Sequence, residues 1–337
     1  MSTEGHTLNE LLGRILIIGG TGFVGTHCLR DVLKHGGPNV QVYTFNRTIA
    51  PKEKQVPNVT YLQADLGDSN AVLKAVQEAQ PTVVLHLASP KPFIESNAVY
   101  ESSNIRGTKN LLAACDQVST VKALVYCSSV SVIDDGKIQT LHGDESWPVL
   151  FAPEQKSFYW HSKAMAETLI LGHNSSKMLT TALRVTAIFG EDDEQIIGGL
   201  IDQAKKGALG VQIGDGRNRQ CWTYVGTVTQ AHIHAARCLL REREKGVEEG
   251  MRVGGEAFYI TNDEARPFWG FARQVAAEAG FPVQEDKAST SRATLRYTVA
   301  EQIFSMDKAK KRMGFIPKVT IDEGIKRSVG SFRGKSF

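Results

Sequence analysis

One pattern constrains the fold of this chain more than any other: from about residue 14 to 190, short apolar runs alternate with longer amphipathic runs. The pattern opens with "RILIIGG" and "FVGTHCLRDVLKHG" and recurs in "TVVLHLA" and "KALVYCSS". Runs such as "TVVLHLA" are apolar throughout, as strands are when helices cover both faces of a parallel sheet. The alternation therefore predicts an α/β fold with a doubly wound parallel sheet.

A glycine-rich turn, "ILIIGGTGFVG", joins the first expected strand to the first expected helix, and it places Gly19, Gly22 and Gly25 three residues apart. Glycine permits a tight turn and lets backbone N–H groups approach a pyrophosphate at the positive N-terminus of a helix. A plain strand-to-helix connection can also contain glycines. The strand before this turn and the helix after it favour the dinucleotide-binding unit of a Rossmann fold.

The end of the second expected strand bears on the choice of cofactor. A unit that prefers NAD usually carries Asp or Glu there, whereas this strand ends in "TFNRT" with Asn46 and Arg47. A guanidinium without a neighbouring carboxylate can pair with a 2′-phosphate, so NADP is predicted. NAD is the alternative, with Arg47 solvated and Asn46 bonding the ribose. Asp65 closes the third strand, where it could meet the adenine amino group or simply begin the next helix.

The pattern loosens after residue 190, which suggests two regions. Residues 13–190 are expected to form the dinucleotide-binding Rossmann domain, and residues 191–337 mainly a smaller substrate-binding region. Residues 226–260 are expected to return to the sheet, so that the two regions interleave. Further helices are expected near 227–241, 266–280 and 320–330.

Composition restricts the partners. Lys plus Arg number 39 against 36 Asp plus Glu, and the longest basic run is "KAKKR", so no nucleic-acid groove is expected. The polar N-terminus and the lack of an apolar window of 18 residues predict no signal peptide, no integral membrane segment and a cytoplasmic location. The five cysteines show neither C-x-x-C pairs nor metal-ligand spacing, which predicts reduced thiols and no metal site. They are Cys28, Cys115, Cys127, Cys221 and Cys238.

The stretch "FYWHSKAMAE" places Tyr159 and Lys163 four residues apart, on one face of an expected helix. A phenol with a pKa of about 10 is protonated at neutral pH, and a nearby ammonium favours the phenolate. Such a tyrosine can exchange a proton with a secondary alcohol while a hydride moves to or from nicotinamide. Taken alone, this spacing is common in helices and has no functional meaning.

Polar residues elsewhere give the Tyr–Lys pair its context. The apolar run "ALVYCSSVSV" is expected to be a strand with Ser129 at its carboxyl end, where the hydroxyl could bond a substrate oxygen. Ser128 is expected to make turn or capping bonds instead. Asn104 could hold a water that links Lys163 to solvent, or could be an ordinary helix amide.

Several motifs together resemble those of the extended short-chain dehydrogenase/reductases, over roughly residues 13–280. The similarity is greatest to the branch of 3β-hydroxysteroid dehydrogenases and sterol-4α-carboxylate 3-dehydrogenases. The motifs are the glycine turn, "HLASP" (86–90), "SNIRGTKNLL" (103–112), "VYCSSVSV" (125–132), the Tyr–Lys pair, "LRVTAIFG" (183–190), "GDGRNRQCWTYVGTVTQAHIHAA" (214–236) and "TNDEARPFW" (261–269).

The resemblance implies roles for individual residues. Tyr159 would be the acid/base, Lys163 would lower its pKa and bond the nicotinamide ribose, Ser129 would position the substrate oxygen, and Asn104 would complete a proton relay. The implied cofactor-binding residues are Gly19, Thr21, Gly22, Phe23, Val24, Gly25, Asn46, Arg47, Asp65, Leu66, Leu87, Ala88, Ser89, Tyr159, Lys163 and Val185.

Three positions depart from the family pattern. Val185 stands where Pro is usual, and Cys221 and Thr227 stand where a carboxylate and an Asn or Asp are frequent. These differences affect the expected position of the bound substrate in the site. The second strand also lacks the acid typical of NAD-using sterol enzymes, which concerns the cofactor and the direction of the reaction.

A substrate pocket with apolar walls is expected near the strand ends, and a bulky steroid, terpenoid or polyketide would suit it. His86 and His161 are expected to have ordinary structural roles. The candidate pocket residues are Pro90, Phe93, Trp160, Phe189, Ile196, Ile197, Trp222 and Tyr224.

These observations favour an NADP(H)-dependent oxidoreductase that acts on a ring hydroxyl or ketone of a bulky apolar substrate of the steroid, terpenoid or polyketide kind. One alternative is NAD(P)-dependent oxidative decarboxylation of a 3-hydroxy-4-carboxy sterol-like acid. Another is an epimerase that retains its cofactor, and a third is a dinucleotide-sensing scaffold without turnover, against which the complete Ser–Tyr–Lys set argues. The oligomeric state is left open, a homodimer being one option.

Overall fold

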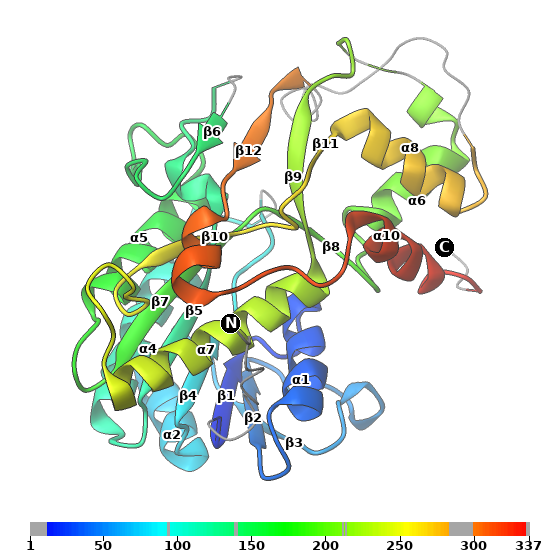
Figure 1. Ribbon diagram of the computed structural model, residues 1–337. Coiled ribbons are helices and arrows are strands. Elements are labelled where there is room, and N and C mark those ends of the chain that lie inside the picture. The colour runs from blue at the N-terminus through cyan, green and yellow to red at the C-terminus, as the bar shows by residue number, and fades with distance from the viewer. Residues whose placement is uncertain are drawn as a thin grey trace, which may run out of the picture.

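A parallel sheet of seven strands forms the centre of the computed structural model (Figure 1). Its strands are, in spatial order, β10 (Ala257–Ile260), β7 (Leu179–Val185), β5 (Ala123–Ser129), β4 (Val83–His86), β1 (Arg14–Ile18), β2 (Gln41–Asn46) and β3 (Val59–Gln63). Strands β2 and β3 continue to one side of β1, and β4, β5, β7 and β10 to the other. The chain thus changes direction between β1 and β4, where sheets of this kind bind ligands beyond their carboxyl ends. The structure describes residues 12–92, 95–137, 141–210, 212, 214–282 and 299–334.

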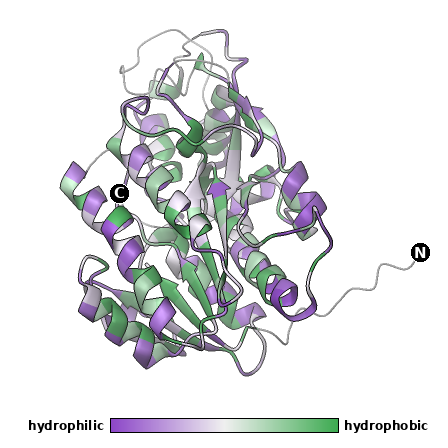
Figure 2. Ribbon diagram, turned by 90° about the vertical axis from the view of Figure 1, so that its left-hand side faces the viewer, coloured by the Kyte–Doolittle hydropathy of each residue, from purple (hydrophilic) through white to green (hydrophobic). Residues whose placement is uncertain are grey.

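Helices cover both faces of this sheet. Ile15 and Ile17 of β1 pack with α1 and α7, while Leu16 and Ile18 point to the other face and pack with α2, α4 and α5. All four side chains are almost wholly buried, because successive residues of a strand face opposite sides. Figure 2 shows the hydrophobic colour concentrated on the strands. The predicted doubly wound α/β sheet is therefore confirmed. These helices are α1 (Phe23–His35), α2 (Ser69–Ala79), α4 (Gly107–Gln117), α5 (Phe158–Gly172) and α7 (Val225–Lys245).

A second, smaller sheet lies beyond the carboxyl ends of the central strands (Figure 1). Its core includes Trp222 stacked on Phe271, with ring centroids 4.0 Å apart, and Phe189 against the edge of Phe271. Its strands are β6 (Leu141–Gly143), β8 (Ala187–Phe189), β9 (Arg219–Tyr224), β11 (Ala265–Pro267) and β12 (Gln302–Phe304). Helices α6 (Ile197–Lys205), α8 (Phe268–Glu278) and α10 (Ile321–Gly330) pack around it.

The shorter helical segments are α3 (Asn97–Tyr100), η1 (Lys52–Lys54), η2 (Glu101–Arg106), η3 (Val130–Ile133), η4 (Ala208–Gly210) and η5 (Ala309–Met313). The helices expected near 227–241, 266–280 and 320–330 are α7, α8 and α10. Within the described ranges, none of the helices is long and apolar enough to cross a membrane.

Candidate active site

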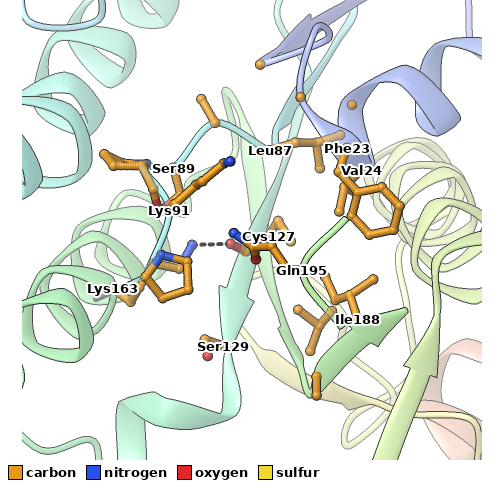
Figure 3. Close-up of a pocket in the computed structure, with 18 of the residues that line it drawn as sticks. Phe23, Val24, Leu87, Ser89, Lys91, Cys127, Ser129, Lys163, Ile188 and Gln195 are labelled. Atoms are coloured by element: carbon orange, nitrogen blue, oxygen red, sulfur yellow. Dashed lines mark hydrogen bonds between the residues drawn. The ribbon is translucent and has the colours of Figure 1, made fainter. Parts of the chain in front are cut away.

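A cavity of about 1310 Å³ lies at the carboxyl ends of the central strands, and residues of β8, β9 and β12 in the smaller sheet form part of its lining. Figure 3 shows some of the residues that line it. Its walls include Gly19 after β1, Leu87 after β4, Ser129 at the end of β5 and Val185 at the end of β7. A site for one small ligand usually measures about 300–1,000 Å³. This cavity therefore has room for a dinucleotide and a second molecule together.

The glycine turn leaves no room for side chains at two of its positions. Gly19 has φ +88°, and a Cβ there would lie 2.8 Å from the Cα of Ala88. A Cβ on Gly25 would lie 2.0 Å from the carbonyl oxygen of Gly19. Both contacts involve backbone atoms, so glycine at position 19 lets the turn approach the segment after β4, and glycine at position 25 lets α1 approach the end of β1.

Helix α1 begins at Phe23 with its N-terminus directed at the cavity. Its capping residue Gly22 makes no side-chain hydrogen bond, and its first turn contains no acidic residue. The first N–H groups of the helix are thus left for an anion, with the positive end of the helix dipole behind them. These features fit the pyrophosphate of a dinucleotide.

Asn46 and Arg47 both line the same end of the cavity. The amide oxygen of Asn46 accepts a hydrogen bond of 3.0 Å from the Thr21 hydroxyl, which ties the end of β2 to the glycine turn. Arg47 is exposed. Asp65 lines the cavity too, and its carboxylate accepts a 2.8 Å hydrogen bond from the N–H of Gly67. The residue that caps the next helix is Asp68, so Asp65 does not begin it.

Tyr159 and Lys163 lie one turn apart on α5, and both line the cavity. The Lys163 ammonium is buried, donates a 2.5 Å hydrogen bond to the carbonyl oxygen of Cys127 and lies 4.4 Å from the centre of the Tyr126 ring (Figure 3). Burial lowers the pKa of Lys163 to about 8. The Tyr159 ring packs edge-on against Tyr100, with centroids 5.4 Å apart. One helix face thus brings a phenol and an ammonium to one wall of the cavity.

Ser129 faces the same cavity from the end of β5. Its hydroxyl oxygen accepts hydrogen bonds from the backbone N–H of Ser131, at 3.1 Å, and from the Ser131 hydroxyl, at 2.8 Å. Two accepted bonds leave the Ser129 O–H available as a donor. A hydroxyl donor is what an alcohol or carbonyl oxygen in the cavity needs.

Asn104 lies behind the cavity and not on its wall. It belongs to η2, a π-helical segment of a kind that is frequent at functional sites. Its side-chain amide donates a 2.9 Å hydrogen bond to the Ser162 hydroxyl, and its backbone carbonyl oxygen accepts a 2.6 Å hydrogen bond from the Thr108 hydroxyl. Ser162 in turn donates to the carbonyl oxygen of Tyr159, so Asn104 contacts the first turns of α5.

Some of the candidate pocket residues line the cavity, and others lie in a hydrophobic core. Pro90, Trp160, Ile196 and Trp222 line the cavity. The expectation for Phe189, Ile197 and Tyr224 was wrong, because these side chains pack into the core of the smaller region. Phe93 lies outside the described residues. Lining residues that the sequence interpretation missed include Lys91, Ile188, Gln195, Leu200, Phe268 and Phe304.

The two histidines lie away from the cavity wall. His86 is buried, its Nε2 lies 3.3 Å from the Thr108 hydroxyl, and burial lowers its pKa to about 3. His161 Nδ1 accepts a 3.2 Å hydrogen bond from the N–H of Ala152. Both positions fit structural roles.

Several known proteins are similar to this chain in sequence. Sterol-4-alpha-carboxylate 3-dehydrogenase (decarboxylating) of Saccharomyces cerevisiae is 32% identical, covering 94% of this chain and 96% of the relative. The Candida albicans protein of the same name is 31% identical, covering 94% and 97%. A 3beta-hydroxysteroid-dehydrogenase/decarboxylase, isoform 1, of Arabidopsis thaliana is 32% identical, covering 94% and 79%.

Solved structures show the same fold. The Thermus thermophilus UDP-glucose 4-epimerase in complex with NAD superposes with a TM-score of 0.73 at 25% identity, covering 96% of this chain and 100% of that one. The Thermotoga maritima UDP-glucose 4-epimerase with UDP-glucose gives a TM-score of 0.74 at 20% identity, covering 95% and 98%.

A family model also matches residues 16–289, which is most of the chain. This match and the named relatives confirm the resemblance that the motifs predicted, and with it the prediction of an oxidoreductase. The chain belongs to the 3-beta hydroxysteroid dehydrogenase/isomerase family.

Proposed function

We propose that this protein is a nicotinamide-dependent dehydrogenase that oxidises a ring hydroxyl of a bulky apolar molecule or reduces the corresponding ketone. The observation that supports it most is the meeting of Ser129, Tyr159 and Lys163 on one wall of a cavity that also contains the glycine turn. An assay of hydride transfer between NADP+ or NAD+ and ring alcohols tests this proposal.

Each of these side chains has a separate task in the proposed reaction. A bound nicotinamide supplies the hydride acceptor or donor. Tyr159 takes the hydroxyl proton of the alcohol as a phenolate, and the Lys163 ammonium favours that phenolate. Ser129 donates its O–H to the substrate oxygen and holds it within reach of Tyr159. Lys163 donates one N–H to the carbonyl oxygen of Cys127, so two N–H donors remain for the nicotinamide ribose and for the Tyr159 phenol.

The preference for NADP rests on Arg47. Its exposed guanidinium lies at the cavity wall, and no carboxylate stands at the end of β2 to repel a 2′-phosphate. The Asn46 amide oxygen accepts a hydrogen bond from the Thr21 hydroxyl, and the amide is neutral. Arg47 is therefore the residue of this pair that could bind a phosphate through a positive charge. We propose NADP(H) as the preferred cofactor, with NAD(H) as the alternative.

The variant Arg47→Ala tests this preference. Loss of a charge-assisted contact of about 1.5–3 kcal/mol should raise the KM for NADPH by about ten- to a hundredfold. NADH has no 2′-phosphate, so its KM should stay nearly constant. Initial rates with the two cofactors measure both values. If the KM for NADPH does not change in Arg47→Ala, or if the wild-type protein uses NADH as well as NADPH, NAD(H) is favoured over NADP(H) as the cofactor.

The lining of the cavity favours an apolar substrate over a sugar nucleotide. Trp160, Trp222 and Phe268 contribute aromatic surface to the wall. Asp192 and Glu194 line the cavity too, and from Val185 onward the described lining residues include no Lys or Arg. The diphosphate of a sugar nucleotide would add negative charge beside these carboxylates. This arrangement argues against the epimerase alternative.

Oxidative decarboxylation is the second candidate, and two observations favour it. Curated relatives are named decarboxylating sterol-4-alpha-carboxylate 3-dehydrogenases. In addition, Lys91 lines the cavity, and the Tyr100 hydroxyl donates a 2.6 Å hydrogen bond to its carbonyl oxygen. Since Tyr100 packs against the Tyr159 ring, the Lys91 backbone lies about one tyrosine side chain away from the proposed acid/base. A carboxylate on the carbon next to the reacting hydroxyl would fall within reach of the lysine.

The chemistry of that second candidate follows from the oxidation. Once the hydroxyl becomes a ketone, the substrate is a β-keto acid. The bond between its carboxylate and ring carbon breaks, carbon dioxide leaves, and the electron pair passes to an enolate. Hydrogen bonds from Ser129 and Tyr159 to the enolate oxygen would stabilise it before a proton returns to the ring carbon.

The variant Lys91→Met tests whether this lysine receives the carboxylate. With a 3-hydroxy-4-carboxy sterol, kcat/KM should fall by about ten- to a hundredfold, since a charge-assisted contact is lost. With the same sterol lacking the carboxylate, kcat/KM should be unchanged. Lys74→Met, on the exposed side of α2, is the matched control. An equal loss with both sterols would show that Lys91 does not recognise the carboxylate.

A further inference from the structure

A buried ion pair lies directly behind the cavity, and the proposed reaction does not use it. Glu167 on α5 is 0% exposed and Arg184 on β7 is 3% exposed. The guanidinium donates to the carboxylate from Nη2 at 2.6 Å and from Nε at 3.0 Å. The Ser128 hydroxyl donates to the second carboxylate oxygen at 2.5 Å. One carboxylate therefore joins α5 to two neighbouring strands.

The position of this pair along the strands is informative. Ser128 and Arg184 are paired directly across β5 and β7, and the residue after each of them, Ser129 or Val185, lines the cavity. Glu167 thus bonds β7 one residue before it enters the cavity wall, and it bonds β5 at Ser128, which lines the cavity next to Ser129. The constraint acts immediately below the proposed substrate-binding serine.

The same helix face is bonded to β5 a second time. Lys163, one turn before Glu167, donates to the carbonyl oxygen of Cys127. Helix α5 is therefore attached to Cys127 and Ser128, two consecutive residues that precede Ser129. Through these bonds the direction of Ser129 depends on the face of α5 that also carries Tyr159 and Lys163.

Stability alone does not account for charges at this place. Desolvating an ion pair costs about as much as the pairing returns, and well-packed apolar residues of similar volume are often as stable or more so. The best-attested use of such pairs is to fix one arrangement of the chain. An arrangement fixed just below reacting groups affects catalysis, because a misplacement of about 1 Å can lower a rate by about 100-fold.

We propose that Glu167, held by Arg184, is a positioning residue that fixes Ser129 and Lys163 relative to each other below the cavity. The inference rests on the proposed function for the roles of Ser129 and Lys163. It adds a residue that touches neither substrate nor cofactor and acts through Ser128 and through the shared helix face.

Electrostatics support the same assignment. The pKa of Lys163 is lowered mainly by burial, and the charge of Glu167 acts in the opposite direction. Burial lowers the pKa of His86 and of His232, so both histidines are neutral near pH 7. Burial raises the pKa of Cys127 and of Tyr126, so both are protonated. The titratable groups that face Lys163 are His86 from β4, Tyr126 and Cys127 from β5, Tyr159 and Glu167 from α5, and His232 from α7.

The first test replaces the pair with apolar residues, as Glu167→Met with Arg184→Met. The melting temperature should change by only a few degrees, since no charge is left buried and unpaired. The Kd for NADP+ should rise severalfold and kcat should fall by about ten- to a hundredfold, because Lys163 and Ser129 lose their fixed relation. A native-like melting temperature with unchanged NADP+ affinity and unchanged kcat would overturn the proposal.

Two milder variants keep the test decisive if the double variant does not fold. Ser128→Ala removes one hydrogen bond and leaves the ion pair intact, and it should lower kcat by about tenfold. Thr180→Val is the matched control, because the Thr180 hydroxyl donates to the carbonyl oxygen of Ile170 on the same helix, away from the cavity. Equal effects of the two variants on kcat would show a merely structural role.

A second measurement needs no substrate. Competitive acylation of Lys163 with a trace reagent, read by mass spectrometry across pH, reports the midpoint of its titration. In Glu167→Gln this midpoint should move down by about one pH unit, since a facing negative charge is lost. An unchanged midpoint would overturn the proposal. If the wild-type protein turns over no ring alcohol, the proposed function is wrong. The titration midpoint of Lys163 still tests whether Glu167 acts on Lys163, because this measurement needs no substrate.

Discussion

Replacing Tyr159 with phenylalanine is expected to lower kcat by about 10²- to 10⁴-fold while leaving the Kd for NADP+ nearly unchanged. The change removes only the phenolic O–H, so the ring still packs against Tyr100 and α5 keeps its apolar contacts. Steady-state rates with a ring alcohol give kcat, and quenching of protein fluorescence by NADP+ gives the Kd. Tyr61→Phe, on β3 and away from the cavity wall, is the control.

Retention of more than about a tenth of the wild-type kcat would exclude Tyr159 as the group that moves the proton. A large rise in the Kd with little change in kcat would mean that the phenol binds the cofactor and does no acid/base work.

Lys163→Met is expected to act differently, because the ammonium has two proposed tasks. The rate should fall by about 10²-fold or more, and the Kd for NADP+ should rise by about ten- to a hundredfold, as expected for the loss of a hydrogen bond from a charged donor. Methionine is close to lysine in length and apolar enough for a buried site beside the Tyr126 ring. Stability should therefore be retained, which thermal unfolding can confirm.

The pKa of Lys163 predicts how the affinity for the cofactor changes with pH. Burial lowers its pKa to about 8 in the free protein, so the side chain is an ammonium below that pH and an amine above it. A bound dinucleotide is anionic and favours the ammonium, so binding takes up a proton above pH 8. The Kd for NADP+ in the wild-type protein should rise as pH rises through about 8. In Lys163→Met this dependence should be absent; if it persists, another group is responsible for it.

The fold could be predicted because its signals are local. Strands β1, β4, β5 and β10 are short, mostly apolar runs, and the glycine turn lies where β1 meets α1. The spacing of Tyr159 and Lys163 likewise showed that they share a helix face. What spacing could not show is the partner of the ammonium, since Cys127 lies 36 residues earlier in the chain.

The walls of the cavity were less accessible to sequence reasoning. An aromatic residue suits a core and a cavity equally well, so Phe189 and Tyr224 were assigned to the cavity although they pack in the core of the smaller region. Phe268 was missed for the same reason. Lys91 is a single lysine in a loop and has no periodicity to mark it. Glu167 could have been found from its spacing, since it continues the Tyr159–Lys163 face by one more turn.

Hydride transfer between nicotinamide and a ring carbon in this cavity can be measured directly. The purified protein is incubated with NADP+ or NAD+ and a panel of 3-hydroxysterols with and without a 4-carboxylate. The near-ultraviolet absorbance of the reduced nicotinamide and the mass of the sterol product are then followed together. We expect equal amounts of reduced nicotinamide and ketone, formed faster with NADP+ than with NAD+, and carbon dioxide from the carboxylated sterol only. Tight binding of either dinucleotide with no reduced nicotinamide from any alcohol of the panel would contradict the proposed hydride transfer and support the dinucleotide-sensing alternative.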